Sequence, residues 1–408
     1  MPGRPQPCYA DGFRCTGSEC EDNCCGGWGI YVDKATYKKY RASPFLRGLA
    51  AQHLRLNVPR HDNFQYARIR FTPEGKCPFL GPDRLCVIHK QHGAEFLCKS
   101  CARYPRAYAR FEGALEKALY LSCPEAARMV LLGQPLLPPP NGEAYRDFLL
   151  ENSQDRPSQS SGSLPQLLRS FALQLLRDGG YPLWQRLLLL GIVCRRIDGP
   201  ARSQQSTEVA VLLAQYAQMI VEGRLRPSLD AIPARPGLQL DLVLQLIRRR
   251  FVIEQPDQGF ATVVGDFLLG IHRSPEVPLQ ESAKLYHEAC SRYYQPFAEA
   301  YPHFLENYLI NYLVRTRFPF PDTNRVQRQI DPLPAFLLMA FHYRLLHSLL
   351  IGVAARYRES FSSTHAIEVA RRFARGIEHH VSFLDELTEF VRSPELCGTD
   401  GLAVVLRS

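Results

Sequence analysis

Long, uninterrupted hydrophobic segments of the kind that direct a protein into or across a membrane are not expected in this sequence. Its N-terminus, MPGRPQPCYADGF, has no apolar run behind the arginine, so no secretory signal is expected. No uncharged apolar stretch reaches the length of about eighteen residues that a membrane-spanning helix needs. Residues 336–355 come nearest, but His342, Arg344 and His347 interrupt them. We predict a cytoplasmic protein. Residues 336–355 are predicted to form a buried core helix, and peripheral membrane contact by this helix is the alternative.

Features of nucleic-acid-binding proteins are also missing. The net charge is +9, but the basic residues are spread along the chain and accompany no DNA- or RNA-binding motif. Hydrophobic residues make up 46% and charged residues 22% of the chain, which is ordinary for a globular protein. No fixed-period repeat occurs, so a solenoid is not indicated. We expect a globular protein that binds no nucleic acid.

Cysteine, in contrast, is abundant and unevenly distributed. Of 13 cysteines, all but Cys194, Cys290 and Cys397 lie in the first third of the chain. The clustered ones are Cys8, Cys15, Cys20, Cys24, Cys25, Cys77, Cys86, Cys98, Cys101 and Cys123. In a reducing compartment, clustered thiols favour metal ligation over disulfides. This distribution therefore predicts a thiolate-ligated centre near the N-terminus.

The cysteine spacing favours an iron–sulfur cluster over zinc. The spacings are C-x3-C-C from Cys20, C-x8-C from Cys77, C-x2-C from Cys98, and then Cys123. Adjacent cysteines do not easily reach one mononuclear site, and few histidines lie beside them to complete a zinc site. Zinc and purely structural thiols or disulfides remain alternatives. The C-x3-C-x2-C signature of radical enzymes is not matched, because its third cysteine would fall at Gly27.

Periodicity divides the chain into two units and predicts a mainly α protein. We expect a small cysteine-rich α+β metal-binding domain over residues 1–135, a linker over 136–163 and an all-α helical domain over 164–408. The linker is indicated by LLPPPNG and by the Ser-rich stretch NSQDRPSQSSGSLP. Beyond it, apolar residues recur every three or four positions. Helices are predicted at 164–179, 183–197, 207–222, 238–253, 261–272, 278–293, 302–317, 333–356 and 364–391.

Local signals also predict elements of the first unit. The alternation over residues 28–32 indicates an extended segment, and Asp33 is a suitable N-cap for the helix that follows. A strand is predicted at residues 65–71 and a helix at residues 125–133. The pattern of residues 115–121 fits either a strand or a helix. These elements would bring the cysteine pieces together.

The cysteine pieces resemble the flagellin lysine-N-methylase family. The similar stretches are CTGSECEDNCCGGWGIYVDKATYKKY, CPFLGPDRLCVIH, LCKSCARYPR and LSCPEAARMVLL, together with FLENYLINYLVRTRFPF at 304–320 and the helix at 336–355. The N-terminal part is also similar to a wider group of CxxxCC-type proteins. The resemblance implies methyl transfer from S-adenosylmethionine to lysine ε-amino groups of flagellin, and a [4Fe–4S] cluster. The positions that match the family's cysteines are Cys20, Cys24, Cys25, Cys77, Cys86, Cys98, Cys101 and Cys123.

The implied reaction needs a neutral lysine, because an ammonium ion has no lone pair with which to attack a methyl group. A site can lower the lysine pKa by desolvation and by offering a proton acceptor. Candidate catalytic residues near the cysteines are Tyr37, Tyr104 and Asp33. Candidate cofactor-binding residues are Trp28, Arg103 and Arg106, through cation–π or carboxylate contacts. Packing, capping and surface roles are the competing interpretations for all six.

Two further questions stay open at this level. The Gly-rich turn of Rossmann-type methylases is absent, so a cofactor site would be of another kind, and the transfer is either radical or polar. The main alternative to an enzyme is a non-enzymatic iron–sulfur or zinc-binding protein with a redox-sensing or interaction role.

Overall fold

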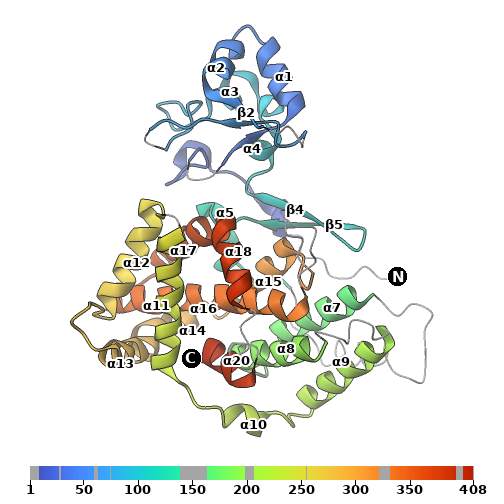
Figure 1. Ribbon diagram of the computed structural model, residues 1–408, viewed down its shortest axis with the longest axis vertical. Helices are drawn as coiled ribbons and strands as arrows, with labels where there is room; N and C mark the ends of the chain where they lie inside the picture. Colours follow the sequence, from blue (N-terminus) through green and yellow to red (C-terminus); the bar gives the residue numbers. More distant parts are fainter. Residues whose placement is uncertain are drawn as a thin grey trace.

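The protein is mainly helical, with 66% helix and 7% strand. The structure, a computed structural model, describes residues 9–26, 29–58, 63–73, 75–137, 163–197, 206–253, 255–320, 331–391 and 398–407. A small unit of short helices and strands stands above a larger helical body, and a hairpin lies between them (Figure 1). The mainly α prediction is confirmed. The predicted linker falls mostly outside the described residues, so the domain boundaries stay a prediction.

The small unit is built round a three-stranded antiparallel sheet of order β1–β3–β2. Its elements are β1 (Tyr31–Val32), α1 (Lys34–Ala42), α2 (Leu46–His53), β2 (Leu54–Leu56), β3 (Ala67–Ile69), α3 (Val87–His92) and α4 (Lys99–Arg103). Asp33 caps α1 as predicted, because its carboxylate accepts from the backbone N–H of Thr36. Ile30, Val32 and Phe79 form part of a buried core that belongs to this unit alone. The strand predicted at 65–71 is confirmed as β3.

A β-hairpin leads from the small unit to the body. β4 (Arg106–Phe111) pairs with β5 (Ala114–Leu119), and Phe111 lies opposite Ala114. The two turn residues, Glu112 and Gly113, both have positive φ, which the tight two-residue hairpin turn requires. Residues 115–121, read from sequence as strand or helix, therefore start as a strand. The end of β5 is held by the body, because the Asn311 amide exchanges two hydrogen bonds of 3.0 Å with the backbone of Leu119.

The body is a set of helices packed round one central helix. Its elements are α5 (Pro124–Leu131), α7 (Leu164–Arg177), α8 (Leu183–Ile197), α9 (Ser206–Val221), α10 (Arg226–Asp230), α11 (Pro236–Ile253), α12 (Gln258–Gly270), α13 (Leu279–Ala289), η5 (Cys290–Tyr294), α14 (Gln295–Ala300), α15 (Phe304–Thr316), α16 (Pro332–Tyr357), α17 (Ser363–Phe373), η7 (Ala374–Glu378), α18 (Val381–Phe390) and α20 (Thr399–Leu406). The short η1 (Tyr9–Gly12), η2 (Gly17–Glu19), η3 (Ala94–Phe96) and η6 (Arg358–Ser360) complete the fold. α16 contacts α8, α12, α13, α15 and α17.

The central helix α16 is the apolar stretch noted in the sequence, and it is buried as predicted. By length and composition alone it could cross a membrane, but its whole apolar window lies inside the fold. The interrupting Arg344 is fully buried, and its guanidinium donates to the carbonyls of Val405 and Leu406 at 2.6 and 2.8 Å. Arg344 therefore satisfies the last carbonyls of α20, which is why a core helix carries a charge.

Glycines set the close approach of α12 to α16. A Cβ at Gly352 would lie 2.2 Å from the Phe267 ring, and one at Gly270 would lie 2.0 Å from the Gly352 carbonyl. Gly352→Ala should therefore lower the free energy of unfolding by about 2–3 kcal/mol, because overpacking forces a well-packed core to shift. Gly265→Ala, on the partner helix α12 at a position with open space, should instead raise the free energy of unfolding by up to about 1 kcal/mol. Urea unfolding of the two variants checks this, and equal effects would contradict it.

The last predicted helix, 364–391, is interrupted. α17 passes into the π-helical segment η7, and His380 then adopts an extended conformation before α18 begins. A π-segment inserts a residue into the helical turn and often occurs at functional sites. Here it brings Arg375, Glu378 and the following His379 to the side of the body that faces the hairpin and α5.

Candidate functional site

Six cysteines from three segments gather in the small unit, and we call them the thiol group. They are Cys24 and Cys25 before β1, Cys77 and Cys86 before α3, and Cys98 and Cys101 at α4. The backbone N–H of Cys77 donates to the Cys25 carbonyl at 2.7 Å, which joins the first two segments. The Cys101 thiol lies close enough to interact with Cys98, Cys25 and Cys24. The fold thus brings together six of the eight predicted ligands.

Contacts among these thiols set their proton affinities. The hydrogen bond between Cys98 and Cys101 raises the pKa of Cys101, whose thiol donates it, and lowers the pKa of Cys98. The hydrogen bond with Cys25, together with burial, raises the pKa of Cys24. For Cys25, the bond with Cys24 lowers the pKa, but contact with Cys77 and burial outweigh it and raise the pKa to about 12. Neighbouring thiolates would repel one another, and a positively charged centre between them would remove that repulsion.

Cys20 and Cys123, the other two predicted ligands, have different neighbours. Cys123 is buried at the N-cap position of α5, and its strongest thiol interactions are with Cys20 and Cys15. Burial raises the pKa of Cys123 to about 12, although the backbone N–H groups of the first turn of α5 oppose the rise. The eight positions therefore divide into the thiol group and a second set.

The thiol group fits an iron–sulfur cluster in number and in chemistry. Such a cluster takes three or four thiolates, and six cysteines converge here. Three of them, Cys25, Cys77 and Cys98, are buried, which shields a centre from solvent. Within the described ranges, no three His, Cys, Asp or Glu side chains are arranged to hold a single metal ion. Which cysteines are ligands stays a prediction.

The predicted catalytic candidates occupy different environments. Asp33 is only 3% exposed, and its carboxylate accepts from Thr36 and from the backbone N–H of Lys99 at 3.2 Å. Burial raises the pKa of Asp33, but these hydrogen bonds outweigh burial and hold the pKa below its ordinary value. The Asp33 carboxylate caps helix α1. Tyr37 packs its ring against Tyr66. Tyr104 is the one of these three whose side chain joins hydrogen bonds with the body, and the catalytic role of all three stays a prediction.

Two of the predicted cofactor-binding candidates, Arg103 and Arg106, lie in the part of the chain that the structure describes. The Arg106 guanidinium donates to the Phe13 carbonyl at 2.8 Å and lies over the Phe13 ring. Arg103 is exposed and lies over the ring of Tyr108, with 5.6 Å from Cζ to the ring centroid. Trp28 lies outside the described residues. Their role in cofactor binding stays a prediction.

A line of three hydrogen-bonded side chains, here called the polar row, connects the small unit to the body. Tyr104 Oη lies 3.0 Å from Ser122 Oγ, and Ser122 Oγ lies 2.8 Å from His379 Nε2. Ser122 is 3% exposed, whereas the residues at both ends are half-buried. Ser122 and His379 could not be predicted, because no local sequence pattern marks either residue; only folding brings them within reach of Tyr104.

The surroundings of His379 keep its imidazole neutral. Burial is the main cause that lowers its pKa to about 4, and the nearby cations Arg315 and Arg375 lower it further, whereas Glu378 opposes them. Glu378 is itself occupied, because it pairs with Arg315 at 2.9 Å and accepts from Tyr308 Oη at 2.8 Å. The polar row therefore has a neutral imidazole at one end over the whole physiological pH range.

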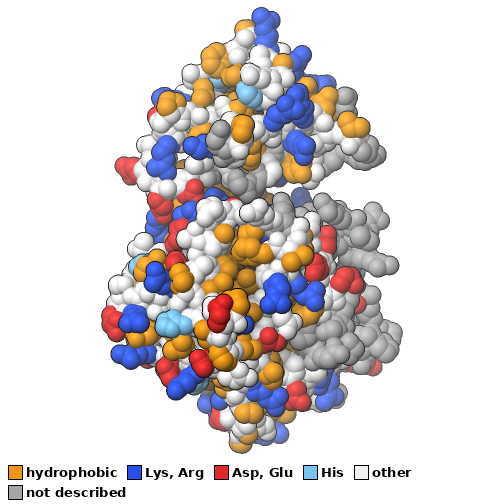
Figure 2. All heavy atoms as spheres, turned by 60° about the vertical axis from the view of Figure 1, so that its left-hand side comes forward, with side chains coloured by type: hydrophobic (Ala, Val, Ile, Leu, Met, Phe, Trp, Pro, Cys, Tyr) orange, Lys and Arg blue, Asp and Glu red, His pale blue; other side chains and the backbone are white. Residues whose placement is uncertain are grey.

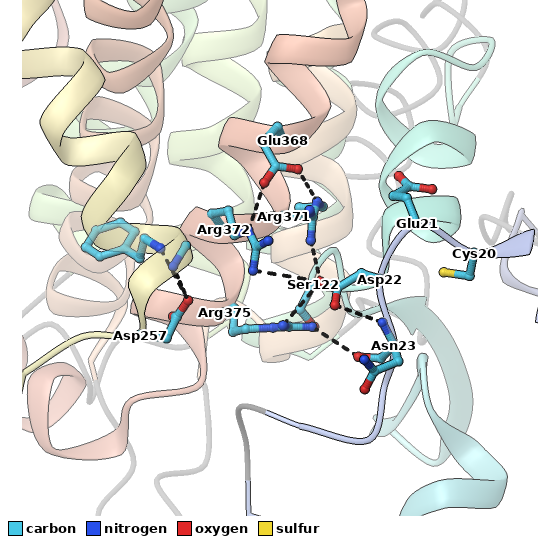
Figure 3. A network of polar contacts seen from close by, with 12 residues as sticks. Cys20, Glu21, Asp22, Asn23, Ser122, Asp257, Glu368, Arg371, Arg372 and Arg375 are labelled. Atoms are coloured by element: carbon cyan, nitrogen blue, oxygen red, sulfur yellow. Dashed lines mark hydrogen bonds and ion pairs between the residues drawn. The ribbon is translucent and has the colours of Figure 1, made fainter. Parts of the chain in front are cut away.

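The loop that carries Cys20, Cys24 and Cys25 is fastened to the body by three arginines, which we call the arginine clamp (Figure 3). Its members are Arg371, Arg372 and Arg375. All three face the Asp22 carboxylate; the Arg375 contact is 3.2 Å and the Arg372 contact 3.8 Å. Burial raises the pKa of Asp22, but the three guanidiniums and the backbone N–H of Asn23 outweigh burial and hold that pKa below its ordinary value. Asp22 is therefore a carboxylate at neutral pH.

The clamp continues directly into the thiol group. The Asn23 side-chain carbonyl accepts from the backbone N–H of Cys25 at 3.0 Å, and the Cys25 carbonyl accepts from the backbone N–H of Cys77 at 2.7 Å. On the body side, Glu368 pairs with Arg371 at 2.5 Å and with Arg372 at 2.8 Å, which fixes the guanidiniums. A continuous chain of polar contacts thus runs from α17 through Asp22 and Asn23 to the buried thiols.

Fold and site together define a mainly helical protein whose cysteine-rich unit is clamped to a helical body. A family model described as the FliB lysine N-methylase C-terminal domain matches residues 169–405. The chain therefore belongs to the FliB lysine N-methylase family, which confirms the resemblance noted in the sequence. No solved structure matches the chain.

Curated relatives agree with this assignment over a shorter stretch. The lysine-N-methylases of Salmonella typhimurium and Salmonella choleraesuis are each 37% identical over 129 residues, which covers 31% of this chain and 32% of theirs. The flagellar biosynthetic protein FliU of Salmonella muenchen is 36% identical over 129 residues, which covers 31% of this chain and 75% of FliU. The chain thus spans about a third of the length of the two lysine-N-methylases in these alignments.

Proposed function

We propose that this protein is an S-adenosylmethionine-dependent protein lysine N-methyltransferase that acts on flagellin in the cytoplasm, before export. Membership of the FliB lysine N-methylase family is the observation that carries the proposal. The names of the relatives, lysine-N-methylase and a flagellar biosynthetic protein, support the reaction and the substrate. The thiol group supports dependence on an iron–sulfur cluster held by three or four of its six cysteines; with three, one iron would stay open to another ligand.

The chemistry asks the protein chiefly to present a neutral amine. In the polar route, the lysine nitrogen forms a bond to the methyl carbon while the carbon–sulfur bond breaks, and S-adenosylhomocysteine leaves with the electron pair. This step balances without an electron donor. A bound cluster would supply an iron with affinity for the amino and carboxylate groups of S-adenosylmethionine. The chain itself must exclude water, orient the lysine and keep it unprotonated.

Anaerobic protein, reconstituted with iron and sulfide, should transfer labelled methyl groups from S-adenosylmethionine to flagellin lysines. Mass spectrometry of the digested flagellin would locate the label. Flagellin with its lysines already dimethylated chemically is the matched control and should accept far less label. If the reconstituted protein binds iron but leaves flagellin lysines unmodified, the methyltransferase proposal is wrong.

A second candidate function is a redox-sensing protein without methyltransferase activity. The direct contact of the Cys98 and Cys101 thiols favours it, since such a pair can oxidise to a disulfide. This candidate predicts reversible oxidation of the pair with no label on flagellin in the same assay.

A further inference from the structure

The excess positive charge of the chain resides in the small unit. Residues 30–104 contain fourteen Lys and Arg but only five Asp and Glu, so their net charge is +9. This equals the net charge of the whole chain, and the remaining residues are therefore neutral in sum. Basic residues occur along the whole chain, but acidic residues are scarce in this stretch. Figure 2 shows Lys and Arg side chains over the surface of the small unit.

The cations of the small unit are exposed, and few have a carboxylate beside them. The described ones are Lys34, Lys38, Lys39, Arg41, Arg47, Arg55, Arg68, Arg70, Lys76, Arg84, Lys90, Lys99 and Arg103, and all are exposed. Among the described residues of this stretch, Asp33 is buried as a helix cap and Asp83 pairs with Lys90 at 2.5 Å, which leaves Glu95. Such a surface carries a positive potential that salt screens only in part.

Three arginines come together on the open face of the three-stranded sheet, and we call this surface the arginine face. Arg55 on β2 lies directly opposite Arg68 on β3 in the antiparallel register. Arg70 follows two positions later and points to the same side. Its backbone N–H donates to the His53 carbonyl at 2.7 Å, so the strand pairing continues to this position. Ala67, between them in register, points to the other side and is buried in the core.

The arginine face is unfavourable for folding, which indicates a role in binding. Opposite side chains of an antiparallel pair have Cβ atoms about 5 Å apart, and like charges in these positions destabilise the sheet. In the part of the chain that the structure describes, none of the three guanidiniums pairs with a carboxylate. A ligand with carboxylates would satisfy them, because each guanidinium presents a planar fork of donors that matches a carboxylate.

The aromatic rings of the small unit favour a carboxylate ligand over a nucleic acid. Proteins that bind single-stranded nucleic acids stack bases on free aromatic rings. Here the Tyr66 ring packs against Tyr37 with 5.3 Å between centroids, and Lys34 Nζ lies 5.8 Å from the Tyr66 centroid. Lys99 Nζ lies 4.4 Å from the centroid of the exposed Phe64 ring. Because the protein's own side chains engage these rings, the surface offers charges rather than stacking platforms.

We propose that the arginine face binds a carboxylate-rich surface of the protein substrate and guides that substrate onto the enzyme. This inference rests on the proposed function. Attraction between oppositely charged surfaces raises the rate of encounter, and salt weakens it. A lysine flanked by acidic residues would therefore be methylated in preference to one in basic surroundings, which the small unit repels.

Neutralising the arginine face tests this inference. The combined variant Arg55→Gln, Arg68→Gln and Arg70→Gln should raise the KM for flagellin about 10-fold at low salt and keep kcat within about 2-fold, since the lost charges act on encounter. The difference should shrink at about 0.5 M salt, because the Debye length then falls to a few ångström. Urea unfolding should show this variant to be at least as stable as wild type, because like charges no longer oppose each other.

A matched control removes the same charge from the body. Arg195, Arg196 and Arg248 are exposed, and their combined replacement by glutamine should leave the KM for flagellin at the wild-type value. Equal KM values for the arginine-face variant and this control would overturn the inference. An inactive wild type would instead contradict the proposed function, so the two failures are distinguishable.

Poly-L-glutamate gives a readout that needs no methyl transfer. It should bind the wild-type protein, compete with flagellin, and bind the arginine-face variant about 10-fold more weakly than the body control. Equal affinity of the two variants for poly-L-glutamate would overturn the inference. So would tighter binding of duplex DNA or of phosphatidylglycerol vesicles than of poly-L-glutamate to the wild-type protein, since the face would then serve a phosphate ligand.

Discussion

Replacement of Cys98 by serine is expected to abolish the iron–sulfur centre and flagellin methylation together. Cys98 is 2% exposed and lies at the N-cap position of α4. The hydrogen bond from Cys101 lowers the pKa of the Cys98 thiol, which favours its thiolate form. A serine hydroxyl at the same position is a far weaker ligand for iron. Iron and sulfide content after anaerobic reconstitution should fall to background, together with the visible absorbance of the cluster.

Two other cysteines serve as controls for this result. Cys290→Ser, at a half-buried cysteine in the body, should leave the iron content unchanged. Cys123→Ser tests whether the cluster needs only the six cysteines of the thiol group or all eight positions predicted from the sequence. We expect this variant to keep its cluster, because the thiol neighbours of Cys123 are Cys20 and Cys15. The assignment of the cluster to the thiol group would be contradicted if Cys98→Ser kept a normal cluster or if Cys123→Ser lost it.

Replacement of Asp22 by alanine should release the cysteine loop from the body. Three guanidiniums would lose their shared carboxylate, and removing one partner of a mostly buried ion pair costs about 3 kcal/mol. We expect that loss in the free energy of unfolding, together with faster alkylation of Cys24 and Cys25 in the metal-free protein, because Asp22 no longer holds their loop to the body. Asp11→Ala removes an exposed ion pair with Lys117 and should cost under about 1 kcal/mol.

The contribution of Asp22 should depend on pH in one direction. Its pKa is lower in the folded protein than its ordinary value of about 3.9, so the stabilisation is fully present above that value. It is lost as the pH falls below about 4 and through the folded pKa. Urea unfolding of wild type and Asp22→Ala should therefore differ most at pH 7, and the difference should shrink steadily as the pH falls below about 4. A difference that persists unchanged in acid would show that the clamp does not act through the charge of Asp22.

Hydrophobic periodicity predicted most of the helices because it is a local property of the chain. Apolar residues three or four positions apart make a face that must be buried whatever it packs against. The strand β4 was not predicted, since RAYARF alternates poorly and is held by its partner β5 and by α15. The break at η7 was missed for a related reason: residues 364–391 read as one helix, and the π-segment is fixed by the contacts of Arg375 and Glu378.

The amino-acid sequence alone was enough to predict a first third rich in cysteine, with ten thiols, a mainly α fold and the family. Only the tertiary structure decided which of those groups meet. It divided the cysteines into two sets and joined Tyr104 to Ser122 and His379. It also closed the arginine clamp on Asp22 across a separation of 349 residues. The physical reason is that sequence spacing fixes distances only within a turn or a strand, whereas burial and ion pairing select partners from the whole chain.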